Sequence, residues 1–184
     1  MATLVVEDGT GLPDANCYSS MEDSDAYHDS VGHTAWVEAV SSPPDDVRVQ
    51  AKIRGAAYID RYPSQVNRTW PGSRVNGRDQ AMAWPRENAV DQEGEEIDDE
   101  SVPNEVIIAS YEAEWREFQD PGSLTPDVIT AQQVLSERVG SIAVTYSNTA
   151  GVQAQIPVIT EIENILSSIL GRSRGTRNSN VSRM

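Results

Sequence analysis

The chain has 184 residues and a formal net charge of −15, and only 6% of its residues are aromatic. This length is sufficient for one domain with a moderate core. The acidic balance argues against a surface that wraps nucleic acid, because affinity for the phosphate backbone comes mostly from clustered Lys and Arg. The single cysteine, Cys17, excludes an internal disulfide and a metal site built from several cysteines.

The low aromatic content predicts a lean hydrophobic core. Such a core suits either a small domain with mobile loops or a subunit that draws stability from neighbouring copies. The sequence shows no signal peptide and no apolar run of the roughly 20 residues that a membrane span needs. We therefore expect a soluble protein made in a reducing compartment, with no membrane partner.

Residues 1–16 are expected to form an extended arm, with a short strand at residues 4–6 and a turn at residues 7–14. A phosphate-binding loop is disfavoured there, because the segment lacks a following Lys and contains Glu7, Asp8 and Asp14.

Two short helices are predicted after this arm. Ser20 and Asp23 form a capping-box pattern that opens a helix from Met21 to about Val31, and a second segment, residues 34–40, brings Trp36 toward the core. His28 and His33 lie five residues apart and are expected to be solvated surface histidines rather than metal ligands.

Residues 46–62 have the most regular helical pattern in the sequence and are predicted to form the central helix. Its apolar stripe includes Ile53, Tyr58 and Ile59, and Pro63 is expected to end it. The pattern leaves five charged side chains to face water or partners, namely Arg48, Lys52, Arg54, Asp60 and Arg61.

Residues 63–101 contain tryptophans beside prolines and are predicted to form a long ordered loop. We expect Trp70, Trp84, Pro85 and Arg86 to be structural anchors, because a large ring on a stiff backbone loses little entropy on packing. Base stacking is the alternative, with Arg68, Arg74, Arg78 and Arg86 nearby. The acidic run at residues 91–100 weighs against it.

A second long helix is predicted at residues 104–118, and a β-hairpin at about residues 130–147. In the hairpin, Ile142, Val144 and Tyr146 alternate with small or polar residues, which is typical of a half-buried strand. An edge strand of this kind offers a surface for pairing with another subunit.

The last helix is predicted at residues 157–170, with an apolar stripe that includes Ile159, Ile162, Leu166 and Ile169. Residues 172–184 form a separate basic tail, which contains no acid and four arginines: Arg172, Arg174, Arg177 and Arg183. This tail is either a solubilising extension or an arm that becomes ordered on an acidic partner.

Several segments together resemble one family. They are Val6–Asn16 with Tyr18, Ala26–His28, Gly55–Asp60 with Tyr62, Gln80–Arg86, Val102–Pro103 and Val139–Tyr146. This ordered set is similar to the tailed-bacteriophage head–tail connector (adaptor) proteins, many of which carry the label DnaT-like single-stranded DNA binding protein. The resemblance spans about residues 4–170. The acidic insertion near Glu93–Glu100 and the arginine-bearing tail differ from the family pattern.

The resemblance implies a mainly α subunit: a small helical bundle with a long ordered loop and a protruding β-hairpin, assembling as a ring of twelve copies. Residues 1–171 would be the adaptor domain. The ring would lie at the head–tail junction of the virion, between the portal protein and the tail-completion or neck proteins, after synthesis in the host cytoplasm. Double-stranded DNA would pass through it without tight binding.

In the connector family the C-terminal helix and tail dock on the portal, and hairpins bind neighbouring subunits. The docking role maps onto Ile159, Ile162, Leu166, Ile169, Arg172, Arg174 and Arg177, and the subunit contact maps onto Ile142, Val144 and Tyr146. The expected structural anchors are Tyr58, Trp70, Trp84, Pro85 and Arg86.

Two other classes of function compete with this reading. A single-stranded-DNA-binding replication accessory would need a basic, aromatic groove. An enzyme has little support, because the sequence shows no nucleophile motif, paired-carboxylate spacing or phosphate loop. We therefore expect no catalytic residues, no metal site and no cofactor.

Overall fold

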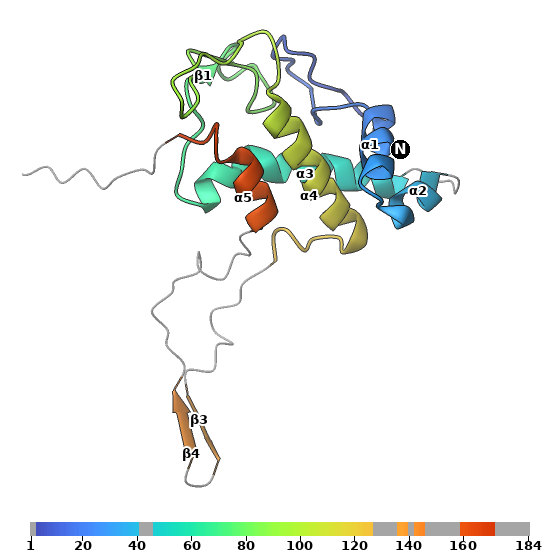
Figure 1. Ribbon diagram of the computed structural model, residues 1–184, viewed down its shortest axis with the longest axis vertical. Coiled ribbons are helices and arrows are strands. Elements are labelled where there is room, and N and C mark those ends of the chain that lie inside the picture. The colour runs from blue at the N-terminus through green and yellow to red at the C-terminus, as the bar shows by residue number, and fades with distance from the viewer. Residues whose placement is uncertain (1–2, 41–45, 127–135, 140–141, 146–158, 172–184) are drawn as a thin grey trace, which may run out of the picture.

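The computed structural model describes residues 3–40, 46–126, 136–139, 142–145 and 159–171. Over these residues the chain is mainly helical and includes a two-stranded hairpin, which confirms the predicted fold class (Figure 1). The elements in chain order are α1 Met21–Ser30, α2 Thr34–Val40, α3 Asp46–Gln65, β1 Ser73–Arg74, β2 Arg86–Glu87, α4 Asn104–Gln119, β3 Ser136–Val139, β4 Ile142–Thr145 and α5 Thr160–Leu166.

Helix α1 begins with the capping box that the sequence predicted. The Asp23 backbone N–H donates to the Ser20 hydroxyl at 3.1 Å, and the Ser20 N–H donates to the Asp23 carboxylate at 3.3 Å. Two backbone donors at the helix start are thereby satisfied. Trp36 of α2 is fully buried, as predicted.

The prediction that Pro63 ends the central helix is wrong, because α3 continues to Gln65. Proline lacks an N–H and so costs a helix one internal hydrogen bond, but in the last turn this loss is small compared with packing. Tyr62 and Pro63 are both buried, and the Arg68 N–H closes the end of the helix by donating to the Pro63 carbonyl at 2.7 Å.

The body is organised by the close packing of α3 against α4, the most extensive contact between two elements (Figure 1). At the contact, Gly55 lies so near α4 that a Cβ atom there would be 2.6 Å from the Glu114 backbone nitrogen. Small buried residues, Ala51 on α3 and Ala109 and Ala113 on α4, allow the same approach. The helix axes can come close only because these side chains are small.

Helix α5 packs on α4 and completes the helical part of the core. It is shorter than the predicted 157–170, because it ends at Leu166 and continues as a turn. The Ser167 hydroxyl donates to the Asn164 carbonyl at 2.7 Å, a local bond that competes with helix continuation. Residues 157 and 158 lie outside the described residues.

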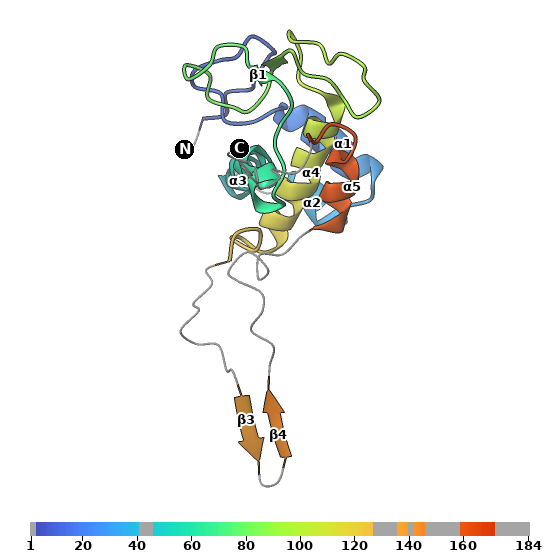
Figure 2. The same cartoon turned by 90° about the vertical axis from the view of Figure 1, so that its left-hand side faces the viewer.

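The N-terminal arm and the long loop lie together at one end of the body (Figure 2). Glu7 is buried, and its carboxylate accepts the backbone N–H groups of Gly9, Gly11 and Leu12 at 3.1, 2.8 and 2.9 Å. The segment is therefore the predicted turn, and the Glu7 carboxylate stabilises it by accepting these backbone hydrogen bonds. In the long loop, β1 pairs with β2 in antiparallel register, with Ser73 opposite Glu87 and Arg74 opposite Arg86.

Strands β3 and β4 form an antiparallel hairpin in which Ser136 pairs with Thr145 and Val139 with Ile142. Both views show this hairpin apart from the helical body (Figures 1 and 2). Tyr146 and residues 130–135 of the predicted hairpin lie outside the described residues. Among the helices that are described, none has the length and hydropathy that a membrane crossing requires.

We predict that Gly55→Ala destabilises the protein by roughly 1–3 kcal/mol, because the added methyl group would overlap the α4 backbone. The sign of the change in unfolding free energy is informative, since Gly→Ala inside a helix would otherwise stabilise the helix by about 1 kcal/mol. Urea unfolding followed by circular dichroism measures the difference. Ala57→Gly, two residues further along α3, is the control for helix propensity, and a Gly55→Ala variant more stable than the parent would contradict the packing argument.

Candidate functional site

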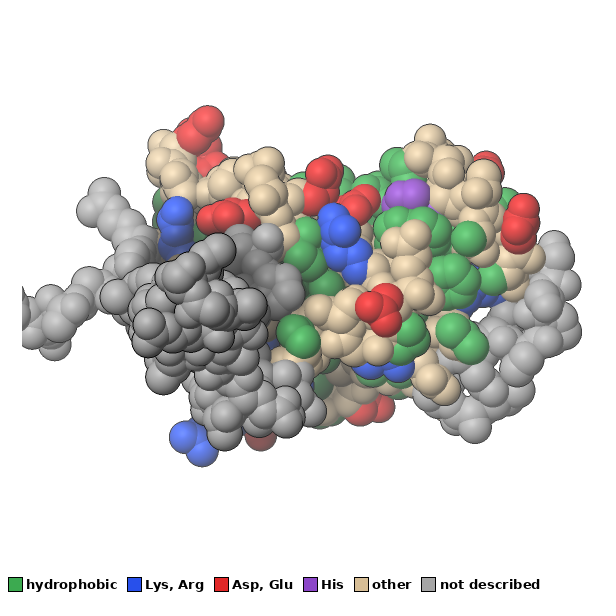
Figure 3. All heavy atoms as spheres, turned by 90° about the horizontal axis from the view of Figure 1, so that it is seen from below, with side chains coloured by type: hydrophobic (Ala, Val, Ile, Leu, Met, Phe, Trp, Pro, Cys, Tyr) green, Lys and Arg blue, Asp and Glu red, His purple; other side chains and the backbone are tan. Residues whose placement is uncertain are grey.

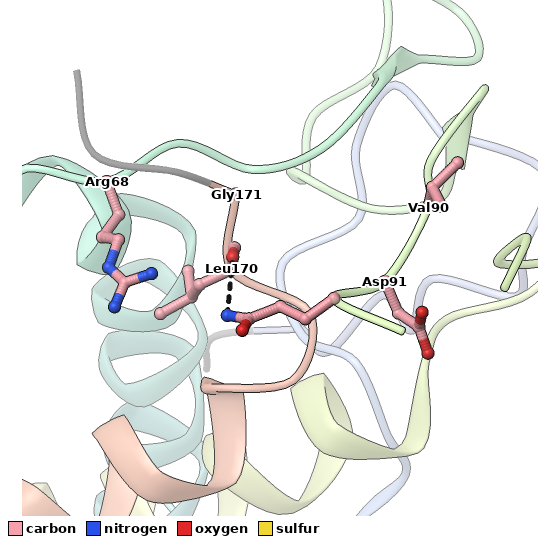
Figure 4. A pocket seen from close by; sticks show the side chains of 6 residues that line it. Arg68, Val90, Asp91, Leu170 and Gly171 are labelled. Atoms are coloured by element: carbon pink, nitrogen blue, oxygen red, sulfur yellow. Dashed lines mark hydrogen bonds between the residues drawn. The ribbon is translucent and has the colours of Figure 1, made fainter. Parts of the chain in front are cut away.

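The end of the body from which residues 172–184 continue is built from three segments: the end of α3, the acidic loop and the turn after α5. They enclose a pocket of about 340 Å³, lined by Arg68, Val90, Asp91, Gln92, Leu170 and Gly171 (Figure 4). Arg68 comes from the chain just after α3, and Leu170 and Gly171 follow α5.

The turn after α5 is fixed by hydrogen bonds to both other segments. The Gln92 N–H donates to the Ser168 carbonyl at 2.9 Å, and its side-chain amide donates to the Ser167 carbonyl and, at 3.3 Å, to the Leu170 carbonyl (Figure 4). The Gly171 N–H donates to the Thr69 carbonyl at 2.8 Å. A Cβ atom at Gly171 would be 2.8 Å from that same oxygen, so the close approach needs glycine. The basic tail therefore starts from a fixed point.

The apolar residues predicted to dock on the portal lie inside the subunit. Ile162, Leu166 and Ile169 are buried in the core, and Ile159 is half-buried against it. Docking through these side chains would require α5 to leave the body, whereas docking through the tail would not. Arg172, Arg174 and Arg177 lie outside the described residues, and the docking role remains a prediction for all seven positions.

The predicted anchors lie at the junction of the long loop with α3. Trp84 is fully buried, and Tyr58 and Pro85 are buried as well. Trp70 is half-buried and meets Trp84 edge-on, with ring centroids 5.7 Å apart and planes at 78°. The burial of Trp84 leaves no ring face for a base, whereas Trp70 keeps part of its surface.

Arg86 holds the loop together through backbone oxygens. Its Nε atom donates to the Pro71 carbonyl, and its two terminal nitrogens donate to Ala83 at 3.0 Å and Gly72 at 2.8 Å. Burial lowers the pKa of this guanidinium, and the nearby Arg74 lowers it further. Arg86, one of the expected structural anchors, thus joins Pro71 and Gly72 to Ala83, and the sequence did not reveal that its partners are backbone carbonyls.

Asp60 was expected to face water or partners, and it is half-buried against partners within the subunit. Its carboxylate accepts the Tyr18 hydroxyl and, at 3.1 Å, the Ala83 N–H, so it joins the N-terminal arm, α3 and the long loop. Burial raises the pKa of Asp60 to about 6, against the lowering effect of the two hydrogen bonds and of Arg74 and Arg61. Desolvation favours the neutral acid, and here it outweighs the partners.

Arg48 and Lys52 were also expected to face water or partners, and both are buried against partners within the subunit. The Lys52 ammonium donates to the hydroxyls of Ser19, at 2.6 Å, and Ser24, and lies 3.2 Å from a carboxylate oxygen of Glu114 on α4. Arg48 donates to Asp25 at 2.7 Å. The sequence left open whether these charged side chains face water or partners, and it did not reveal that the partners lie within the subunit.

The prediction of solvated surface histidines is wrong for His28, whereas His33 is half-buried. His28 is fully buried, and its Nε2 lies 3.0 Å from the second Glu114 oxygen. Its Nδ1 is 2.9 Å from Nδ1 of His33, so one nitrogen donates and the other accepts. His33 stacks on Trp115 at 4.1 Å, and burial and the adjacent His28 lower the pKa of His33. Within the described ranges, no three His, Cys, Asp or Glu side chains are placed to hold a metal ion.

We predict that Asp60 makes the protein less stable as the pH rises. Because its folded-state pKa is raised, its contribution to stability is complete below about pH 4 and is lost as the pH rises through about 6. The unfolding free energy of the parent minus that of Asp60→Asn should therefore fall by up to about 3 kcal/mol between pH 4 and 7. Urea unfolding across this range measures the difference.

The exposed Asp79 provides the control, because Asp79→Asn removes the same charge from the surface of the long loop. A parent-minus-Asp60→Asn difference that stays constant with pH would contradict the assignment of Asp60 as a desolvated acid.

Comparison with known proteins places the chain in a family. A family model described as "Putative DnaT-like ssDNA binding protein" matches residues 2–184. No curated protein and no solved structure matches the chain. Since the match extends over nearly the whole sequence, the protein belongs to this DnaT-like family.

Proposed function

We propose that the protein is a structural subunit of a tailed-bacteriophage head–tail connector, assembling as a ring in the neck of the virion. The observation that carries this proposal is the β3–β4 hairpin, which lies apart from the helical body (Figures 1 and 2). In this role the chain performs no catalysis, and its partners are other copies of itself, the portal protein and the tail-completion proteins.

An isolated two-stranded hairpin is at best marginally stable in water. Both strands of this hairpin have an outer edge whose backbone groups can pair with another chain. A neighbouring subunit would supply the missing strand or apolar cover, and head-to-tail repetition of one such contact closes a ring when the rotation permits. The hairpin thus favours an assembly over a protein that acts alone.

The charges on the body support passage of DNA rather than firm retention. Arg48 and Arg54 are paired with Asp25 and Glu117 at 2.7 and 2.6 Å, and Arg86 is bonded to backbone carbonyls. On the face seen in Figure 3, Lys and Arg side chains form separate small groups between acidic ones. An acidic body in which Arg48, Arg54 and Arg86 are engaged within the subunit suits the wall of a DNA channel.

The second candidate function is binding of single-stranded DNA. It is favoured by the description of the family to which the chain belongs. It predicts salt-dependent affinity for oligonucleotides, because neutralised phosphates release counterions. The two candidates are compatible with one chain only if DNA contact is weak or local.

We predict that the hairpin is needed for self-assembly. Positions 142 and 144 belong to one face of β4 and positions 143 and 145 to the other, because successive residues of a strand alternate. Ile142→Ser with Val144→Ser should raise the dissociation concentration of the assembly at least roughly tenfold, which corresponds to about 1.4 kcal/mol. Ala143→Ser with Thr145→Ser is the matched control, and analytical ultracentrifugation measures both. A chain that is monomeric in solution and absent from purified particles would refute the connector role.

We also predict that deletion of residues 172–184 leaves the body folded but abolishes attachment to the portal. The body should survive because the hydrogen bond from the Gly171 N–H to the Thr69 carbonyl lies before the deletion. Co-purification with portal protein and a thermal melt report the two properties separately. Replacing the four tail arginines by Gln in the full-length chain tests whether charge alone is responsible. Normal attachment of the truncated chain would exclude the docking role of the tail.

A further inference from the structure

A second pocket, of about 320 Å³, lies between the end of α3 and the long loop. Its lining includes two arginines, Arg68 and Arg86, two hydroxyl residues, Ser64 and Thr69, and the half-buried Trp70. Asp60 contributes to the wall as well. Arg68 lines this pocket and also the one from which the basic tail continues, so the two openings are neighbours.

The pocket has the opposite charge to the chain as a whole. Besides Arg68 and Arg86, Arg61 and Arg74 lie close enough for their charges to lower the pKa of Asp60. Arg74 also acts on the pKa of Arg86. Four arginines and one carboxylate thus gather at one place in a chain whose net charge is −15. Such a local field attracts anions that the remaining surface repels.

The donors around the pocket are only partly used within the subunit. Arg86 engages three carbonyls, whereas a guanidinium has five N–H groups. Among the described residues, the Arg68 guanidinium has no hydrogen-bonded side-chain partner, and Figure 4 shows this side chain extended beside Leu170. Asp60 is the one opposing charge in the lining, and its two oxygens are engaged by Tyr18 and Ala83.

Trp70 supplies a rigid aromatic surface beside these cations. Its indole N–H donates to the Asp60 carbonyl at 3.2 Å, and its ring is braced against Trp84. A ring held in this way loses little entropy when another planar group packs on it. Proteins that bind single-stranded nucleic acids combine a basic groove with aromatic rings, because every base has a face that can stack on such a ring.

We propose that this pocket binds one phosphodiester group of single-stranded DNA, through Arg68 and Arg86, with an adjacent base stacked on Trp70. The inference rests on the second candidate function and does not depend on ring assembly. It assigns the contact to a single local site rather than to a long groove. Affinity should accordingly be modest and limited to one or two nucleotides per subunit.

Fluorescence anisotropy of a labelled oligothymidylate of about 15 nucleotides tests the proposal in the full-length protein. Arg68→Ala should weaken binding roughly tenfold. It should also reduce the slope of log affinity against log salt concentration by about one, which corresponds to one lost phosphate contact. Arg78→Ala is the matched control, because Arg78 is an exposed arginine of the same loop that does not line the pocket. It should change the affinity less than about twofold. Equal effects of the two substitutions, or no binding by the parent protein, would overturn the proposal.

An abasic oligonucleotide of the same length tests the base contact without altering the protein. It keeps the phosphates and lacks the bases, so it should bind roughly tenfold more weakly if a base stacks on Trp70. Equal affinity for abasic and normal strands, or for duplex and single strands, would overturn the stacking contact. The mass of the assembly formed by the Arg68→Ala variant should equal that of the parent. Loss of DNA binding with unchanged mass concerns the pocket alone, so failure of the pocket proposal can be distinguished from failure of the connector role.

Discussion

The close approach of α3 and α4 at Gly55 is the constraint on which the rest of the body depends. It places Lys52 of α3 3.2 Å from Glu114 of α4 in the interior. Buried charges are costly unless they are paired and hydrogen-bonded. Ser19, Ser24 and His28 provide the remaining bonds, which fixes α1 and the segment before it on the α3–α4 pair. One packing contact between helices therefore determines where α1 and the segment before it lie.

The other end of the body is held by polar bonds to the backbone rather than by regular secondary structure. Glu7, Asp60, Arg86 and Gln92 each bind backbone groups of a loop or turn, and in this way they satisfy peptide groups that no helix or sheet accommodates. The long loop consequently forms a rigid surface over the end of α3. Both the starting point of the tail and the arginine pocket are parts of this surface.

The two candidate functions use different parts of the molecule. Assembly would depend on the hairpin, which lies apart from the body, whereas nucleic-acid contact would depend on the loop end of the body (Figure 2). The helical core between them connects the two and pairs the buried charges of Arg48, Lys52, Glu114 and Glu117. A subunit built in this way can associate through one region and contact DNA through another, because the hairpin and the arginine pocket lie in different parts of the molecule.

The sequence by itself determined the features that depend on neighbouring residues. These are the capping box at Ser20, the starts of α3 and α4, the existence of the hairpin and the turn around Glu7. The tertiary structure alone decided which polar residues are interior. Lys52, His28 and Asp60 look like surface residues in the sequence, yet Lys52 and His28 are buried and Asp60 is half-buried, because they bond to segments between 23 and 86 residues away along the chain. Pro63 remains helical because long-range packing outweighs its local preference to end a helix. The apolar stripe of α5 is placed in the core of the same subunit, and the local sequence pattern does not show which surface that stripe contacts.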